Sequence, residues 1–503
     1  MLSWTIYTSF LGAAVLTLLP RDNAQAARVA ALLTAMAGFA VALVGTFKAG
    51  AGLNTLCDVS WVPTLGIHYH LAADGISLTL VLLTGIAAVA GILFSWNIEH
   101  RAKEFFAFYL TLIGGVYGVF LSFDVFLLFV FYELAIIPKY FLIAIWGSTR
   151  KEYGAMKLAL YSFVGSAMVL VGIIAAYVVA GAKTMSLIDL AQYPFPEHFQ
   201  AWAFPLVFIG FAILAGLWPF HTWAPTGHVA APTAASMLLA GVVMKLGAYG
   251  AFRVAMTLFP LGAKAWQMPI ATLAVIGIVY GAMVALTQKD FKFVIGYSSV
   301  SHMGFVLLGL MTLNEIGFTG AVLQMFSHGI IGGLLFAVVG RMVYDRAHTR
   351  ELDALEGMDL NKALPFAAAT FVVASAASMG LPGFSGFVAE LQVLIGAWRS
   401  FPTTTVCAGI GILIGVAYTL RVLQKAFFGE VAAEVNPRQT ESDALSRAQP
   451  HGLEPISGPE RIGAVILMAT TLVIGLYPRL LLDLIVPSLN SPLFEGLRRA
   501  GAL

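Results

Sequence analysis

The sequence contains very few charged residues. Only 11% of its 503 residues are Asp, Glu, Lys or Arg, whereas 59% are hydrophobic. Soluble domains carry about 25% charged residues, so this composition excludes an ordinary soluble globule. The formal net charge is only +2 and there is no polybasic run, so we expect no nucleic-acid partner.

Cysteine is also scarce, and the motifs of redox or nucleotide chemistry are absent. The only two cysteines, Cys57 and Cys407, are far apart in the sequence. There is no CxxC, no metal-ligand spacing, no P-loop and no GxGxxG after a strand. We therefore expect no metal and no cofactor on this chain, and any linked redox chemistry must take place on another chain.

The sequence instead has a succession of apolar runs of about twenty residues, the length that crosses a hydrocarbon core of roughly 30 Å. Residues 1–20 lack a basic n-region and a cleavage site, so we expect a membrane helix there rather than a signal peptide. The fold class expected is an all-α integral membrane protein. Charged residues and Pro/Gly punctuation predict fourteen helices, at residues 2–20, 25–47, 76–97, 104–122, 124–146, 153–181, 201–221, 231–257, 268–288, 291–313, 315–342, 363–397, 402–427 and 460–484.

Lys and Arg are distributed unevenly between the two sides of this predicted bundle. By the positive-inside rule the richer side is cytoplasmic, which places both termini on the outer side. Residues 428–459 are the one long polar segment and are expected to be a flexible cytoplasmic loop. The richer side includes Arg101, Lys103, Arg150, Lys151, Lys292 and Arg341, and the poorer side includes Lys48, Lys183, Arg253 and Lys264.

Pro and Gly interrupt two of the predicted helices. The seventh is broken between Pro219 and Pro225, and the twelfth is broken between Gly380 and Gly383, around Pro382. Freed backbone groups at such breaks need water or polar side chains. Broken helices at corresponding positions of two repeats indicate an ion site in transporters.

The breaks fit a division of the chain into two repeats of five helices, at residues 104–257 and 268–427. The broken helix would be the fourth member of each repeat. Three helices in residues 1–103 precede the repeats, and the last helix with its tail in residues 460–503 follows the polar loop.

Four ionisable residues lie deep within predicted membrane helices, namely Glu133, Lys139, Lys245 and Glu390. An ionised group at the bilayer centre costs about 2.5–3.5 kcal/mol on insertion scales and is usually functional. Each one singly could be neutralised by a neighbour, but a set of buried acids and bases is an expensive way to hold helices together. A proton relay needs groups that can be both protonated and deprotonated near neutral pH, and burial brings the pKa of a Glu up and that of a Lys down toward this range. Lys139, nearer the cytoplasmic side, could instead extend to the interface.

Four histidines lie near these residues in the sequence. His302 and His328 fall mid-helix, between the last two of the ionisable residues. A lone intramembrane His is often a hydrogen-bonded packing residue, but imidazole exchanges protons near neutral pH, which favours a relay role here. His221 and His228 lie by the cytoplasmic end of the broken seventh helix. For these two, capping or loop anchoring is as good an interpretation as proton entry.

Four segments resemble the antiporter-like, proton-translocating subunits of respiratory complex I (NADH:quinone oxidoreductase), among them subunit M. They are FYELAIIPKYFLIAIWG, WPFHTWAPTGHVAAPTAASMLLAGVVMKLGAYGAFRV, DFKFVIGYSSVSHMGF and GLPGFSGFVAEL. The resemblance is strong over residues 75–430. It implies a multi-pass subunit of the bacterial inner membrane with two inverted five-helix repeats. Its partners would be the other membrane-arm subunits, the lipid bilayer, and protons carried by water chains.

The resemblance also implies roles for particular residues. In that family a Glu on the fifth helix pairs with a Lys on the broken seventh. A Lys on the eighth helix continues the path, and a charged residue on the broken twelfth ends it, with histidines and water between. Glu133, Lys245 and Glu390 match three of these roles.

This sequence departs from the family pattern in the first repeat. Leu214 stands where the family has the seventh-helix Lys, and Thr226 stands where the following loop usually has an Asp. Lys139, directly after Pro138, occupies a normally apolar position. We hypothesise that Lys139 has taken over as the partner of Glu133. The alternative is a subunit that has lost one proton-loading site and conducts poorly or not at all.

Three functions remain open from the sequence. The first is a proton-pumping subunit of complex I, a cofactor-free part of a translocase. The second is a subunit of a multisubunit cation/proton antiporter or of a membrane-bound hydrogenase, which share this ancestry. The third is a scaffold that only extends a membrane arm. The HTW…APTAAS and SHMGF segments favour the first, and the loss of the seventh-helix Lys keeps the third open.

Replacing Lys139 with Met is expected to abolish proton pumping and to leave assembly intact, because Met preserves an apolar chain of similar length but removes the base. The number of protons moved per electron pair in the reconstituted complex measures this. An unchanged proton stoichiometry would contradict the hypothesis that Lys139 has replaced the missing base.

Overall fold

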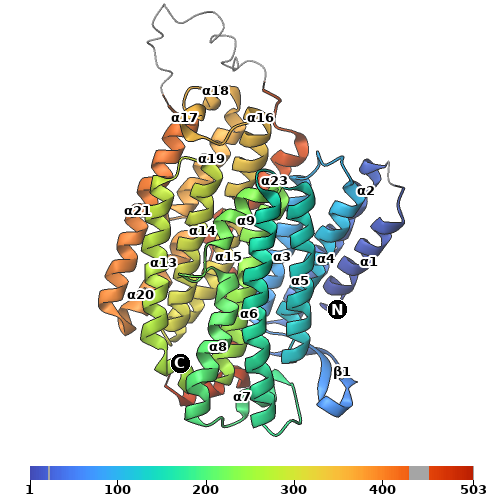
Figure 1. Cartoon of the computed structure of the whole chain (residues 1–503), viewed down its shortest axis with the longest axis vertical. Helices are drawn as coiled ribbons and strands as arrows, with labels where there is room; N and C mark the ends of the chain where they lie inside the picture. Colours follow the sequence, from blue (N-terminus) through green and yellow to red (C-terminus); the bar gives the residue numbers. More distant parts are fainter. Residues whose placement is uncertain (21–22, 430–452, 502–503) are drawn as a thin grey trace, which may run out of the picture.

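The computed structural model describes residues 1–20, 23–429 and 453–501. Most of the polar loop expected at 428–459 therefore lies outside the described residues. Long helices packed side by side form most of the structure, and a small β-hairpin lies at one end (Figure 1).

The elements and their bounds are, in chain order, α1 (Trp4–Leu18), α2 (Ala24–Ala49), β1 (Asn54–Val62), η1 (Pro63–Leu65), β2 (Ile67–Ala73), α3 (Gly75–Leu93), α4 (Ala102–Leu121), α5 (Val125–Trp146), α6 (Lys151–Val179), α7 (Leu187–Gln192), α8 (Glu197–Ala215), α9 (Trp223–Ala230), α10 (Thr233–Leu238), η2 (Leu239–Val243), α11 (Met244–Gly250), η3 (Ala251–Met256), α12 (Pro260–Ala265), α13 (Gln267–Thr287), α14 (Phe291–Met311), α15 (Glu315–Ala337), η4 (Val338–Tyr344), α16 (Asp345–Ala347), α17 (Leu352–Leu355), α18 (Leu360–Ala363), α19 (Pro365–Ser378), α20 (Ser385–Ser400), α21 (Pro402–Phe427), α23 (Gly458–Leu476), α24 (Arg479–Ser488), η6 (Pro492–Phe494) and α25 (Glu495–Arg499). The segments η2, η3 and η4 are π-helical turns that continue the helices beside them.

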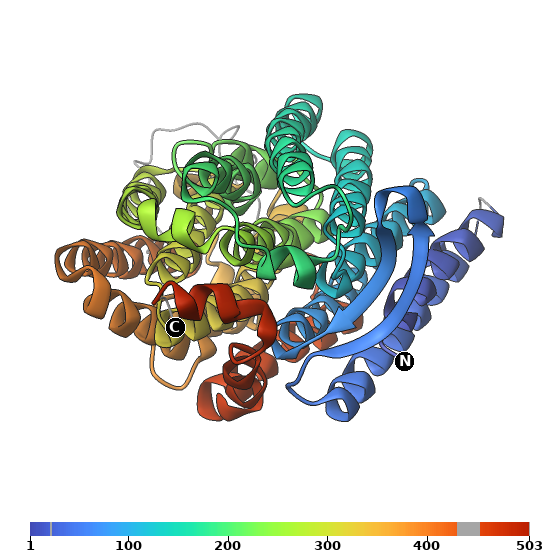
Figure 2. The same ribbon diagram turned by 90° about the horizontal axis from the view of Figure 1, so that it is seen from below.

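The two ends of the bundle differ. The short helices α16, α17 and α18 lie at the end drawn uppermost in Figure 1, termed the loop end. The β-hairpin, α7 and the C-terminal helices lie at the opposite end, termed the hairpin end, which Figure 2 shows from below.

Twelve helices in the described residues are long and apolar enough to cross a membrane, which confirms a predominantly helical membrane protein. Each of the twelve matches one of the fourteen predicted segments. The other two predicted segments are α1, which has only 15 residues, and the pair α19 and α20, which is broken. The bent pair of α24 with the final helix adds a thirteenth span if it is counted as one, so the total of fourteen stays a prediction.

The β-hairpin corrects the all-α expectation. Strands β1 and β2 pair antiparallel, from Asn54 opposite Ala73 to Val62 opposite Ile67. This stretch is rich in β-branched and aromatic residues, which fit the pleated surface of a sheet. The turn closes at Gly66, whose φ is 62°. A Cβ there would lie 2.0 Å from the carbonyl oxygen of Lys183, so only glycine fits this position.

Both predicted helix interruptions are present. Helix α8 ends at Ala215 and α9 begins at Trp223, with Pro219 in the turn between them. The indole of Trp223 donates a hydrogen bond of 2.8 Å to the carbonyl of Ile213, which holds the two parts together. Helix α19 likewise ends before Pro382, and α20 begins at Ser385.

A buried ion pair near the hairpin end joins helices that are far apart in the sequence. We had placed Arg253 among the loop cations, but the side chains of Arg253 and Asp74 are only 0% and 1% exposed. The guanidinium donates two hydrogen bonds, of 2.7 and 2.6 Å, to the two carboxylate oxygens of Asp74. It also contacts the rings of Phe123, Tyr249 and Phe494. Asp74 caps α3, so this pair ties α3 to η3.

Asp74→Asn is expected to lower the free energy of unfolding by about 3 kcal/mol, because Arg253 would stay buried without its counter-charge. Thermal unfolding of the purified protein in detergent measures the loss. Asp58→Asn is the matched control, since Asp58 pairs with His68 at a side chain that is 49% exposed and exposed pairs contribute little. Equal melting temperatures for the two variants would contradict a stabilising role for the buried pair.

Candidate functional site

Lys245 lies in the middle of the fully buried span that runs from Thr233 to Met256. Its side chain is 0% exposed. Its Nζ atom lies 2.7 Å from Nδ1 of His328 on α15 and also donates to the carbonyl of Ala240. Ala240 belongs to the π-helical turn η2, and turns of this kind widen a helix and are frequent at functional sites.

A second histidine continues this arrangement. The rings of His328 and His302 are 5.6 Å apart between centroids, with 30° between their planes. On α14, His302 is bonded on both sides: its Nδ1 lies 2.8 Å from Oε1 of Glu390 and its Nε2 lies 3.1 Å from Oγ of Ser378. Because each ring nitrogen has a partner, the orientation of this imidazole is fixed.

Glu390 ends the arrangement, in the first part of α20 after the break. Its Oε1 also accepts a hydrogen bond of 3.1 Å from Nε2 of Gln324. The turn before α20 passes close to the carboxylate: a Cβ on Gly380, whose φ is +71°, would lie 3.4 Å from Oε2. The glycine therefore supplies a backbone conformation that L side chains rarely adopt. A small cavity lies beside this carboxylate and both histidine rings.

The structure thus brings four of the predicted site residues into one row through the interior of the bundle, in the order Lys245, His328, His302 and Glu390. They come from four different spans, which the sequence separates by up to 145 positions. Each group can bind and release a proton. Lys245 with His328 and His302 with Glu390 lie within the hydrogen-bond distance that proton transfer requires, whereas the two histidine rings lie side by side without a direct hydrogen bond.

The other two histidines lie near the break in the first repeat. His228 is 0% exposed in α9 and stacks on Phe336 with 4.4 Å between ring centroids. His221, in the turn before α9, is 2% exposed and lies edge-on to Tyr280. In the described structure none of their four ring nitrogens has a hydrogen-bond partner of good geometry. Both interpretations of these two histidines, loop anchoring and proton entry, therefore stay predictions.

Glu133 and Lys139 are both on α5 but do not form a direct ion pair. Within the described residues no salt bridge within 4.0 Å includes either of them, and Oε1 of Glu133 and Nζ of Lys139 both lack hydrogen-bond partners. Ser166 on α6 faces the Glu133 carboxylate, and Lys139 is close enough to act on it electrostatically. Lys139 is only 1% exposed, so the alternative that it extends to the membrane interface is wrong.

The two positions at which the resemblance led us to expect a Lys and an Asp, Leu214 and Thr226, also have defined surroundings. Leu214 is buried on α8, and its backbone packs against Gly247, two residues after Lys245. A lysine at position 214 would therefore start beside the Lys245 helix. Thr226 accepts a hydrogen bond of 3.3 Å from Nζ of Lys157, so a cation from α6 reaches the position where the resemblance led us to expect an acid.

Sequence reasoning missed Lys292. We had grouped it with the cytoplasmic loop lysines, but it lies in α14 and is 2% exposed, with Nζ donating 2.9 Å to the carbonyl of Ala231. Its place two residues after Asp290, the N-cap of α14, resembles an ordinary charged helix start. No pattern in the sequence distinguishes it from the exposed lysines, because its burial depends on α9 packing across α14.

Comparison with protein families gives a match over residues 122–415 to the family described as NADH:quinone oxidoreductase/Mrp antiporter, TM. The chain is 37% identical to NADH-quinone oxidoreductase subunit M of Rhodobacter capsulatus, over 97% of this chain and 95% of that one. It is 35% identical to an NAD(P)H-quinone oxidoreductase chain 4 of Synechococcus elongatus, over 95% of this chain and 89% of that one.

Solved structures agree with this assignment. A chain of respiratory complex I from Thermus thermophilus with bound NADH superposes with a TM-score of 0.87 and 27% identity, covering 99% of both chains. A chain of the Mrp complex from Dietzia superposes with a TM-score of 0.83 at 22% identity, covering 100% of this chain and 98% of that one, which shows a shared fold. This chain belongs to the NADH:quinone oxidoreductase/Mrp antiporter family of membrane proteins.

Proposed function

We propose that this chain is an antiporter-like subunit in the membrane arm of a proton-pumping NADH:quinone oxidoreductase. It moves protons while other subunits carry the electrons to quinone. The single observation that carries the proposal is the row of four titratable groups from Lys245 to Glu390 inside a membrane-spanning bundle.

In this function each group of the row receives a proton from one neighbour and gives it to the next. The ammonium of Lys245 transfers a proton to Nδ1 of His328, 2.7 Å away. His328 passes it to the hydroxyl of Ser378 through an intervening water, and that hydroxyl passes a proton to Nε2 of His302, 3.1 Å away. Nδ1 of His302 then protonates Glu390 over 2.8 Å. The hydroxyl of Ser378 gives up one proton as it takes up another, and Gln324 holds the carboxylate of Glu390 in place.

Glu133 and Lys139 form the corresponding unit of the first repeat. Each has a buried polar atom without a partner, and buried polar atoms are nearly always hydrogen-bonded to protein or water. A water between them would satisfy both atoms and join the carboxylate to Lys139, which acts on it electrostatically. This supports Lys139 as the replacement for the base absent at Leu214. In the alternative, the first repeat conducts protons poorly, because Glu133 has no neighbouring base with which to exchange a proton.

The proposal includes an orientation and a repeat structure. The loop end would face the cytoplasm of a bacterium and both termini the outer side of the inner membrane, with fourteen spans in all. Inverted repeats at residues 104–257 and 268–427 are supported by the two breaks, after α8 and after α19, each in the fourth helix of its repeat.

One alternative to this function is supported by a specific observation. The match to the Dietzia Mrp complex shows that this fold also serves in a different kind of assembly, so a cation/proton antiporter or membrane-bound hydrogenase subunit is the second candidate. Co-purification with a quinone site and an iron–sulfur peripheral arm would support the first. Sodium-dependent proton exchange without electron transfer would support the second.

Lys245→Met is expected to lower proton pumping by about tenfold or more, because a proton-transfer group typically contributes at least that much to the rate. Proton uptake and quinone reduction are measured together in liposomes that contain the whole complex. Lys48→Met removes an exposed lysine near the end of α2 and serves as the control. Unchanged stoichiometry in Lys245→Met and in Glu133→Gln would contradict pumping and leave a scaffold role.

A further inference from the structure

Three buried hydroxyl groups join α23, which follows both proposed repeats in the sequence, to the helices that carry two groups of the row. The Oγ atom of Ser385 on α20 lies 2.6 Å from Oγ of Ser327 on α15 and 2.9 Å from Oγ1 of Thr471 on α23. All three side chains are 0% exposed. A buried hydroxyl without a partner is costly, so these three groups, termed the hydroxyl triad, satisfy one another.

The hydroxyl triad lies close to the row in the sequence as well as in space. Ser327 directly precedes His328 in α15. Ser385 is the first residue of α20, and Glu390 follows five positions later in the same helix, about 7.5 Å farther along the axis at 1.5 Å per residue. The start of α20 therefore sets where the Glu390 carboxylate lies.

Local structure does not fix this start, because α20 follows a break and no side chain caps it in the described structure. Its position depends on packing. A Cβ on Gly475 of α23 would lie 2.3 Å from the carbonyl oxygen of Gly383, and a Cβ on Gly386 would lie 2.4 Å from that of Ala377. The backbones of α23 and α19 thus contact the break and the first turn of α20 directly, and the hydroxyl triad adds the directional contacts.

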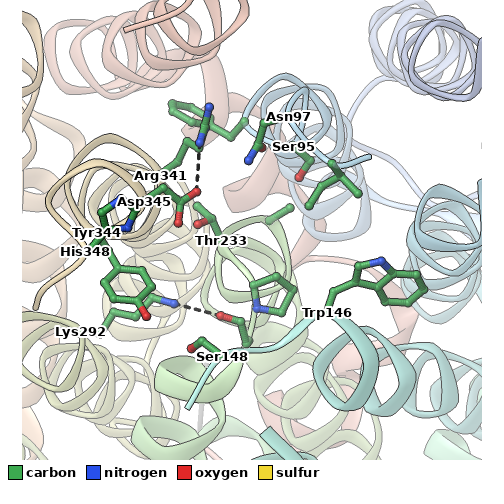
Figure 3. Close-up of a pocket in the computed structure, with 15 residues that line it drawn as sticks. Ser95, Asn97, Trp146, Ser148, Thr233, Lys292, Arg341, Tyr344, Asp345 and His348 are labelled. Carbon is green, nitrogen blue, oxygen red and sulfur yellow. Dashed lines mark hydrogen bonds and ion pairs between the residues drawn. The ribbon is translucent and has the colours of Figure 1, made fainter. Parts of the chain in front are cut away.

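Helix α23 is itself held at the loop end. The carboxylate of Glu460, a residue that is 1% exposed, accepts a hydrogen bond of 2.6 Å from Nε of Arg341 and one of 2.8 Å from Nη2 of Arg346. Arg341 also pairs with Asp345 at 3.1 Å (Figure 3). Both arginines lie on η4 and α16, which continue α15. Helix α23 is therefore fastened to one long helix at two levels, by Glu460 at the loop end and by the hydroxyl triad beside His328.

We propose that α23 belongs to the proton-transfer site, and that the hydroxyl triad holds Glu390 within hydrogen-bond distance of His302. Thr471, Ser385 and Ser327 are positioning residues, which hold the helix start and do not exchange the proton. The inference rests on the proposed function, because the step from His302 to Glu390 over 2.8 Å is the one that it adjusts. A misplacement of about 1 Å can slow such a step by about a hundredfold.

The competing explanation is that these hydroxyls only join helices and stabilise the fold. Thr471→Val separates the two roles, since valine has the shape of threonine but cannot form the hydrogen bond. Thr470→Val is the matched control on the same helix. The hydroxyl of Thr470 donates to the carbonyl of Ile466 within α23, at 2.7 Å, so its loss leaves α20 in place.

In liposomes that contain the whole complex, Thr471→Val is expected to lower proton uptake by about tenfold or more with unchanged assembly and melting temperature. Ser327→Ala is expected to give a similar loss. Thr471→Ser, which keeps the hydroxyl, is expected to restore uptake, and Thr470→Val to retain it. Full uptake in both Thr471→Val and Ser327→Ala would overturn the positioning role, as would an equal loss in Thr470→Val. If Glu390→Gln abolishes uptake in that same preparation, only the positioning role fails; if Glu390→Gln is also unchanged, the proposed function fails.

Infrared spectroscopy tests the position of the carboxyl group directly. The C=O stretching band of protonated Glu390 is identified as the band that Glu390→Gln removes, and its frequency depends on the hydrogen bonds that the carboxyl group makes. Thr471→Val is expected to shift this band and the pH at which it appears, while Thr470→Val leaves both unchanged. A purely structural role would not move the band at an equal melting temperature, so an unchanged band in Thr471→Val would overturn the proposal.

Discussion

An ionised side chain inside a membrane-spanning bundle has no bulk water to solvate it, and this protein accommodates such groups in two different ways. Asp74 and Arg253 are joined by two short hydrogen bonds and surrounded by aromatic rings. A pair of this kind is fixed in its charged form, because neither partner can become neutral without leaving the other buried and unpaired. It fastens α3 to η3, and it has no part in the proposed proton path.

The row from Lys245 to Glu390 follows the opposite design. Lys245 contacts an imidazole and a carbonyl rather than a carboxylate. Glu390 contacts an imidazole and an amide rather than a cation of fixed charge. Partners that can themselves donate or accept a proton stabilise both protonation states of a neighbour. The same bundle therefore contains one permanently charged clamp and one set of groups whose charge can change.

The backbone irregularities occur where this second design needs them. The break between α19 and α20 places a glycine turn against the Glu390 carboxylate, and the π-helical turn η2 offers a carbonyl to Lys245. The break between α8 and α9 ends α9 at Ala231, where its carbonyl receives Lys292. In each case a regular helix would have used these backbone groups for its own hydrogen bonds. A membrane interior tolerates irregular backbone only where it is buried in protein or lines a polar cavity.

The sequence by itself determined the membrane class, twelve of the spans, both helix breaks and the residue types of the site, because each of these depends on local composition. Tertiary structure decided the rest. Lys139 and Lys292 look equally plausible as interfacial lysines in the sequence, and Arg253 looks like a loop cation, yet all three are buried by helices from distant parts of the chain. The order of the row likewise depends on α11, α14, α15 and α20 meeting in space. Burial of a long charged side chain is set by its neighbours across the bundle, and no local pattern records which neighbours those are.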